Sequence, residues 1–390
     1  MAQETASTMA LVAKLKALRE QGGLSPEDIE ERLILGPGWV SSFESGQVVP
    51  SVGMVLAILG VLGRSVHDLV RGLPAKISHK LERQVYAEAQ GENLLISFIY
   101  ANHDAVYELP NATTEEFDEV LRTLRDGLSR LANPDDVVGE AIKTDAVAKD
   151  FLKAVALWPH ANPSDLWWFL IYRAYCDPYN HPARFARMDF TQSWKRTGGW
   201  ALEEVMVRHY GPFLKGKGVN LFIAPLEAKQ RLLGGILAGE RLEADKADVL
   251  LTGSKGSSEK FFGVVNVKAS FAERRTDDVP MSKALIAAGY VSPLWTMDCK
   301  SMPSSHPVNR GELGIARSRD SDQRSAKRKD IEDDGYFSAC FSYNQRTVPT
   351  PSNQRAKARV FVCDFRNPDD QFAAFLFSEW RRFLKGSRRG

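Results

Sequence analysis

Cysteine is scarce in this chain, with four residues out of 390, at Cys176, Cys299, Cys340 and Cys363. The sequence has no Cys-x-x-Cys pair and no cysteine–histidine cluster at zinc spacing. These absences exclude a disulfide-stapled scaffold and a structural zinc site. We therefore expect buried, reduced thiols in a cytosolic protein.

Long apolar runs are also missing. The longest, 54-MVLAILGVLG-63, is too short to cross a bilayer. The first residues, MAQETASTMALVAKLK, lack an n-region followed by the h-region of a secretory signal. We expect a cytoplasmic protein with no membrane partner.

A large net charge is absent too, since the formal value is +2. Apolar residues make up 44% and charged residues 26%, which excludes disordered and collagen-like classes. A length of 390 residues predicts two or three domains. Basic residues nevertheless gather in the second half, in Arg274 and Arg275, in 316–330 and in 381–390, and this distribution suits a polyanionic partner.

What is present begins with five short helical segments over residues 8–72. Ser25 and Asp28 stand at the N-cap and capping-box positions of the second segment, with Pro26 as its first residue. A tight Gly-Pro-Gly turn at 36–38 separates the second segment from the third. This layout is typical of a helix-turn-helix domain.

The same segment resembles the phage-repressor (Cro/C1-type, XRE) family. The family pattern S-x-x-E-x-G-x-x-x-P-S is matched by Ser41, Glu44, Gly46, Pro50 and Ser51.

The resemblance implies that residues 37–45 enter the major groove, with Gly38, Trp39, Ser41 and Ser42 facing DNA. These residues are poor in the side chains that read base edges best, so dimerisation or protein contact is an alternative role for the domain.

The middle of the chain is expected to be a helical connector. Residues 78–135 have a strongly helical pattern, which ends at ANPDD. Two further helical stretches follow, at 146–157 and at 164–180, and the aromatic residues of the second are most simply core. These stretches predict a helical subdomain over 75–188.

A change of character follows at residue 190. A helix is expected over 191–214, opened by its glycine pair, and two apolar strands are expected at 247–253 and 260–270, joined by a polar turn. Asp248 begins the first strand and Lys268 lies near the end of the second. The hairpin places a carboxylate beside an ammonium group.

Phosphodiester hydrolysis needs such a pair. The carboxylate would hold Mg²⁺, which lowers the pKa of a bound water, and the lysine would orient that water and offset transition-state charge. Mg²⁺ prefers several oxygen ligands, so a further acid is wanted.

These residues resemble the PD-(D/E)XK nuclease superfamily. Ala247 and Asp248 stand for "PD", and 266-NVK-268 stands for "(D/E)XK", with Asn266 where the superfamily has an acid. The resemblance implies a catalytic set of Asp248, Asn266, Lys268 and a helix glutamate, assigned to Glu203, so that Asp248 and Glu203 are the metal ligands. The alternatives to Glu203 are Glu204 and, less favoured, Asp277 and Asp278.

The run from 265-VNVKASFAERRTDD-278 to 314, together with 193-SWKRTGGWALEE-204, is similar to type II restriction endonucleases grouped around BsaWI, relatives of enzymes that cut CCGG-core sites. The similarity covers roughly residues 80–345. It implies that Glu273, Arg274 and Arg275 read C·G pairs.

We therefore expect an α+β protein with a restriction-endonuclease-like mixed sheet flanked by helices and an N-terminal all-α helix-turn-helix domain. The expected domains are 1–74, 75–188 and a nuclease core over 189–390, closed by a strand in 358–365 and a helix in 369–384. The expected function is Mg²⁺-dependent cleavage of double-stranded DNA at a palindrome containing CCGG, by a homodimer protected by a DNA methyltransferase. The alternative is a helix-turn-helix regulator with an inactive nuclease-like domain.

Overall fold

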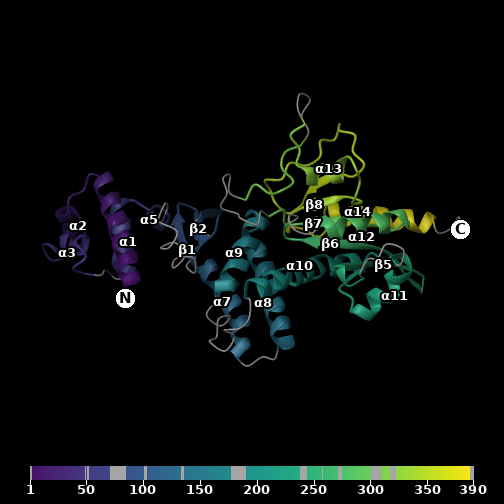
Figure 1. Ribbon diagram of the computed structural model, residues 1–390, viewed down its shortest axis with the longest axis horizontal. Coiled ribbons are helices and arrows are strands. Elements are labelled where there is room, and N and C mark those ends of the chain that lie inside the picture. Colours follow the sequence, from purple (N-terminus) through teal and green to yellow (C-terminus); the bar gives the residue numbers. More distant parts are fainter. Residues whose placement is uncertain are drawn as a thin grey trace. The chain divides into compact units, whose positions relative to one another are not determined.

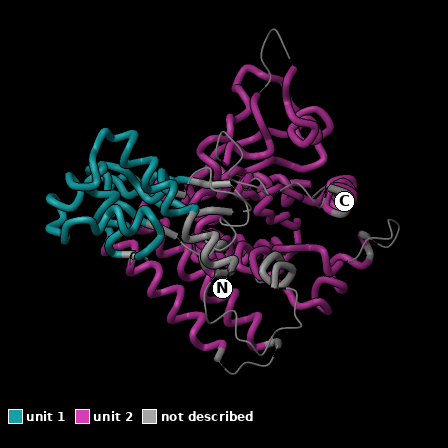
Figure 2. The backbone as a smooth tube through the Cα atoms, turned by 60° about the vertical axis from the view of Figure 1, so that its left-hand side comes forward, with its two compact units in different colours: residues 1–114 teal, residues 115–390 magenta. Residues whose placement is uncertain are grey.

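The computed structural model describes the chain except residues 1, 49, 51, 71–84, 101–102, 133–135, 177–189, 238–243, 257, 271–274, 300–308, 317–321 and 387–390 (Figure 1). The chain forms two compact units, residues 1–114 and residues 115–390 (Figure 2). Within the described ranges, no helix combines the length and the apolar character that a membrane span requires.

The first unit begins with the five predicted helices, which are confirmed: α1 (Ala2–Gln21), α2 (Pro26–Leu33), α3 (Trp39–Glu44), α4 (Val52–Leu62) and α5 (Val66–Val70). The predicted capping box is present, because Ser25 and Asp28 each accept a hydrogen bond from the other's backbone N–H. Leu15, Ile29 and Phe43 lie in a shared core. The buried ion pair of Arg19 with Glu44, 2.6 Å, fixes α3 against α1.

A three-stranded antiparallel sheet completes this unit: β1 (Val85–Gln90), β2 (Asn93–Tyr100) and β3 (His103–Leu109). The prediction of helix across this region was wrong. Leu94 and Ile96 are fully buried and alternate with less buried neighbours, which is a strand period, and Gly91 with φ of 64° makes the hairpin turn. The helical pattern holds only from α7 (Thr114–Ser129) onward.

Long helices form one part of the second unit: α8 (Asp136–Leu157), α9 (Pro163–Cys176) and α10 (Phe190–Lys215). The predicted helices at 146–157 and 164–180 are confirmed as far as Cys176, beyond which residues 177–180 lie outside the described chain. The expectation that the glycine pair opens a helix was wrong, since α10 begins before it and runs through Gly198 and Gly199.

A six-stranded mixed sheet forms the rest, in the order β4-β5-β6-β7-β8-β9. Its strands are β4 (Val219–Phe222), β5 (Val249–Lys255), β6 (Ser258–Lys268), β7 (Leu294–Thr296), β8 (Cys340–Ser342) and β9 (Val360–Val362). β5 pairs in antiparallel fashion with both β4 and β6, whereas β6, β7, β8 and β9 pair in parallel. The predicted hairpin and mixed sheet are therefore confirmed.

Helices cover both faces of this sheet. On one face, α11 (Leu226–Leu237) and α12 (Arg275–Ala287) pack with Leu250 and Val264. On the other, α14 (Gln371–Gly386) places Trp380 against Phe262, with ring centroids 5.2 Å apart. The predicted terminal strand and closing helix are confirmed as β9 and α14. A short helix, α13 (Ala326–Glu332), lies between β7 and β8 in sequence.

Candidate active site

The β5–β6 hairpin brings Asp248 and Lys268 together. Val249 pairs with Val265, so Asp248 lies just outside β5, level with the end of β6. The Nζ atom of Lys268 lies 2.8 Å from Oδ2 of Asp248, and the backbone N–H of Val267 donates to the same oxygen over 2.7 Å. Both side chains are nearly buried. The predicted juxtaposition of an acid and an amine is therefore present.

A second carboxylate reaches the same lysine. Oδ1 of Asp278, in the second turn of α12, lies 3.3 Å from Nζ of Lys268. The Asp278 side chain is 4% exposed, so it faces the site and not solvent. Of the two downstream acids that sequence reasoning had ranked lower, Asp278 is brought to the lysine; the side chain of Asp277 lies outside the described part.

Glu203, on α10, completes a group of buried acids. Burial, followed by the negative charge of Asp248, raises the pKa of Glu203 to about 8, while Lys229 and Lys268 act in the opposite direction. The neighbouring Glu204 points elsewhere, since its Oε2 accepts from Nε of Arg208 over 2.9 Å. The fold thus brings Glu203 to the site and directs Glu204 to a surface ion pair.

Asn266 has a different setting from the acid whose place it takes. Its side chain is fully buried, and Nδ2 donates to Oγ of Ser292 over 2.9 Å and to the carbonyl of Pro293 over 3.2 Å. An ionised carboxylate at this position would have no hydrogen to donate to the Pro293 carbonyl. The amide therefore ties the end of β6 to the start of β7, and its expected catalytic role stays a prediction.

Sequence reasoning missed Lys229, on α11. Its ammonium donates to the carbonyl of Ala247, the residue before Asp248, and its charge acts on Glu203. No local pattern marks this lysine, because the contact depends on how α11 packs against β5.

The predicted DNA-reading cluster is only partly visible. Glu273 and Arg274 lie outside the described residues, and for Arg275 only the backbone is described, as the first residue of α12. In the helix-turn-helix unit, Ser41 is exposed and Ser42 half-buried. Trp39 is half-buried and stacks on Phe43, with centroids 5.9 Å apart, so much of its ring serves the core.

The donor set fits a hard divalent cation. Among the described residues, no three His, Cys, Asp or Glu side chains are arranged to hold a metal without further ligands. Mg²⁺ commonly takes one or two protein carboxylates and completes its shell with phosphate and water oxygens. Burial, and after it the negative charge of Asp248, raises the pKa of Glu203, and a bound cation would favour the ionised carboxylate.

A mixed sheet flanked by helices, with an aspartate and a lysine at the end of its central hairpin, defines a restriction-endonuclease-like nuclease. Comparison with known proteins agrees. Residues 10–71 match the model of a helix-turn-helix domain. The chain is 37% identical to the type II restriction enzyme AgeI of Thalassovita gelatinovora over 243 residues, which are 60% of this chain and 84% of the relative.

The likeness extends to the solved structure of AgeI. An AgeI–DNA complex aligns with a TM-score of 0.59 and 31% identity, over 76% of this chain and 99% of the other. A BsaWI–DNA complex aligns with a TM-score of 0.33 and 14% identity, over 69% and 94%. The chain belongs to the family of type II restriction enzymes that includes AgeI.

Proposed function

We propose that this type II restriction endonuclease hydrolyses double-stranded DNA at a palindromic site containing CCGG, with Mg²⁺ as its cofactor. The observation that carries the proposal is the position of Lys268, which lies 2.8 Å from Asp248 and 3.3 Å from Asp278 at the end of a nuclease-like hairpin. The AgeI structure of the same fold is a complex with DNA.

We assign each residue of the site a separate role in the proposed hydrolysis. Asp248 and Glu203 are the groups that would hold the cation, while Asp278 lies against Lys268. When bound, Mg²⁺ polarises the phosphate and lowers the pKa of water. Lys268, which two carboxylates hold, would orient the attacking water and offset charge as it develops on the phosphoryl oxygens. Lys229 holds the peptide that precedes Asp248.

Base recognition is assigned to Glu273, Arg274 and Arg275. Lys268 must lie near the scissile phosphate, and seven residues of chain span at most roughly 25 Å. Side chains on this segment therefore stay close to the central base pairs, where arginine can bond guanine and a carboxylate can accept from cytosine.

The symmetry of a palindrome implies a homodimer with one active site per strand. We further infer that the protein acts in the cytoplasm beside a DNA methyltransferase that protects the host sites. The second candidate function is a DNA-binding regulator that does not cut, and the amide at Asn266 is the observation that favours it.

Active-site variants separate the two functions. We expect Asp248→Ala and Lys268→Ala to slow plasmid cleavage in Mg²⁺ on the order of a hundredfold or more, while gel-shift binding is retained. The matched control is Lys149→Ala, an exposed lysine paired with Asp145 on α8, which should cut normally. Full cutting by Lys268→Ala contradicts the assignment of the site, and binding without cutting by the wild-type protein supports the regulator.

A further inference from the structure

The carboxyl ends of three neighbouring strands lie level with the active-site lysine. Lys268 of β6 pairs with Thr296 of β7, which pairs with Ser342 of β8. Adjacent strands are about 4.8 Å apart, so Ser342 lies roughly 10 Å from Lys268 along the sheet. β6, β7 and β8 lie side by side (Figure 1), so the segment that follows Ser342 starts near the active-site lysine.

Asn344 anchors the beginning of this segment. Its Nδ2 donates to the backbone carbonyls of Asp298, over 3.1 Å, and Asn309, over 2.9 Å. Its Oδ1 accepts from Nδ2 of Asn162 over 3.0 Å. All four residues are buried, so the anchor is shielded from water.

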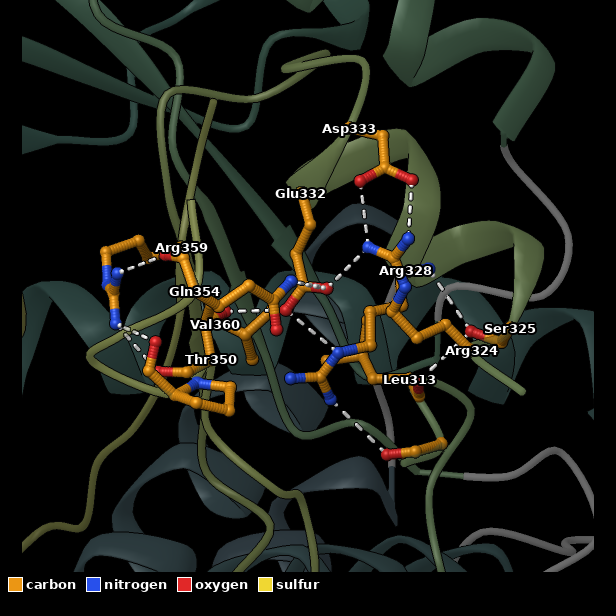
Figure 3. A network of polar contacts seen from close by, with 12 residues as sticks. Leu313, Arg324, Ser325, Arg328, Glu332, Asp333, Thr350, Gln354, Arg359 and Val360 are labelled. Carbon is orange, nitrogen blue, oxygen red and sulfur yellow. Dashed lines mark hydrogen bonds and ion pairs between the residues drawn. The ribbon is translucent and has the colours of Figure 1, made fainter. Parts of the chain in front are cut away.

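Two threonines fix the segment further along. Oγ1 of Thr347 donates to Oδ2 of Asp298 over 2.6 Å. Oγ1 of Thr350 donates to Oε1 of Glu332 over 2.6 Å, and Glu332 in turn accepts from Arg324 and Arg328, as Figure 3 shows. The segment is thus held at three buried points.

Between these points, Gln345, Arg346, Val348 and Pro349 face solvent. Arg346 is itself held, because its Nη1 donates to both carboxylate oxygens of the buried Asp165, over 2.8 and 2.7 Å. Among the described residues no bond to Nε or Nη2 is found, and the Arg346 side chain is 39% exposed. One edge of a fixed guanidinium is therefore presented to solvent.

We propose that residues 345–349 form a second DNA-contacting segment beside the active site and that Arg346 reads a guanine there. The inference rests on the proposed function, since it assumes that DNA lies along this edge of the sheet. A pre-organised planar fork matches O6 and N7 of guanine, and little side-chain freedom is lost when it binds.

The test measures binding by the full-length protein in Ca²⁺, a common non-cleaving substitute, to duplexes that carry the mapped cleavage site and to duplexes with single base pairs changed. We expect Arg346→Ala to reduce the preference for the intact site by about tenfold to a hundredfold. Arg346→Lys should lose most of that preference too, because an ammonium lacks the fork. The matched control is Arg366→Ala, an exposed arginine paired with Asp364, which should keep the preference.

Each other outcome overturns a stated part of the proposal. If Arg346→Ala weakens binding to every duplex alike and lowers the salt slope by about one, Arg346 contacts a phosphate and reads no base. If binding by Arg346→Ala, Arg346→Lys and Gln345→Ala is unchanged while their melting temperatures match the wild type, the segment does not contact DNA. Failure of the wild-type protein to cut any DNA would instead contradict the proposed function itself.

Discussion

At the scale of residues, the candidate active site holds more acidic than basic side chains. Lys268 bridges Asp248 and Asp278, and the charge of Asp248 also acts on Glu203, whose carboxyl is buried. Such crowding is unfavourable in a folded protein unless a cation shares the space. The proposed metal ion would add a second cation to this group of acids, beside Lys268.

The glutamate pair on α10 provides a matched test of this view. We expect Glu203→Gln to slow cleavage at least tenfold and to raise the Mg²⁺ concentration needed for half-maximal rate, because the site loses a negative ligand. Glu204→Gln removes only the ion pair with Arg208 and should cut normally. Rate measurements over a Mg²⁺ titration check both, and equal behaviour of the two variants would contradict the assignment of Glu203.

Asp150, on α8, gives a pH-dependent prediction. Its side chain is fully buried, neither oxygen has a hydrogen-bond partner among the described residues, and burial raises its pKa well above the usual value. A raised pKa means that ionisation opposes folding, so this penalty is absent below about pH 4 and grows as pH rises. We expect Asp150→Asn to increase the free energy of unfolding at pH 7 and to change little at pH 3.5.

The control for this prediction lies five residues earlier. Burial acts to raise the pKa of Asp145, but its bonds to Lys149 and Arg208 outweigh this and lower it. The ionised Asp145 carboxylate therefore stabilises the fold above about pH 4, and this stabilisation is lost in acid. The pH dependence is opposite in sign to that of Asp150. Urea unfolding at the two pH values should show Asp145→Asn slightly destabilised at pH 7; a loss of stability in Asp150→Asn at pH 7 would contradict the account.

At the scale of elements, the hairpin could be predicted and the sheet of the first unit could not. Asp248 and Lys268 are joined by two apolar strands and a polar turn, so their contact follows from local pairing. For residues 85–109, the spacing of polar and apolar residues resembles that of an amphipathic helix, although these residues form strands. Only packing shows that Leu94 and Ile96 share one buried face.

Contacts between distant elements were beyond the sequence. Asp278 reaches Lys268 because α12 folds back along β6, and Lys229 reaches Ala247 because α11 packs beneath β5. Arg346 and Asp165 are 181 positions apart. Spacing cannot reveal such pairs, since each depends on how whole elements dock.

Two glycines test how closely the catalytic strand must be packed. A Cβ at Gly263 in β6 would lie 2.2 Å from the carbonyl oxygen of Val291, so Gly263→Ala should destabilise the fold on the order of 1–3 kcal/mol. A Cβ at Gly199 in α10 meets nothing within 4 Å, and Gly199→Ala should stabilise by about 0.5–1 kcal/mol. Urea denaturation measures both, and a stable Gly263→Ala protein would contradict the close approach of β6 to Val291.

At the scale of the whole molecule, two compact units meet in sequence at Thr114. The predicted boundaries at 74 and 188 stay predictions. The helix-turn-helix match ends at residue 71, and the AgeI structure is covered almost completely by 76% of this chain. That the N-terminal helices form a module separate from the nuclease stays a prediction.

Deletion of residues 1–74 tests this modularity. We expect the shortened protein to cut the same sequence, because every proposed catalytic residue lies after residue 190. Binding should weaken at moderate salt and lose part of its salt dependence, since a groove-binding domain contributes phosphate contacts. Unchanged affinity and salt slope would assign the module to protein contact instead.

The most direct test of the central claim is a digest by the wild-type protein in Mg²⁺ with both ends of every fragment sequenced. The account predicts discrete fragments whose ends all map to one palindrome with a CCGG core, and no fragments from Lys268→Ala under the same conditions. Intact plasmid with retained binding, or ends scattered over unrelated sequences, would contradict it.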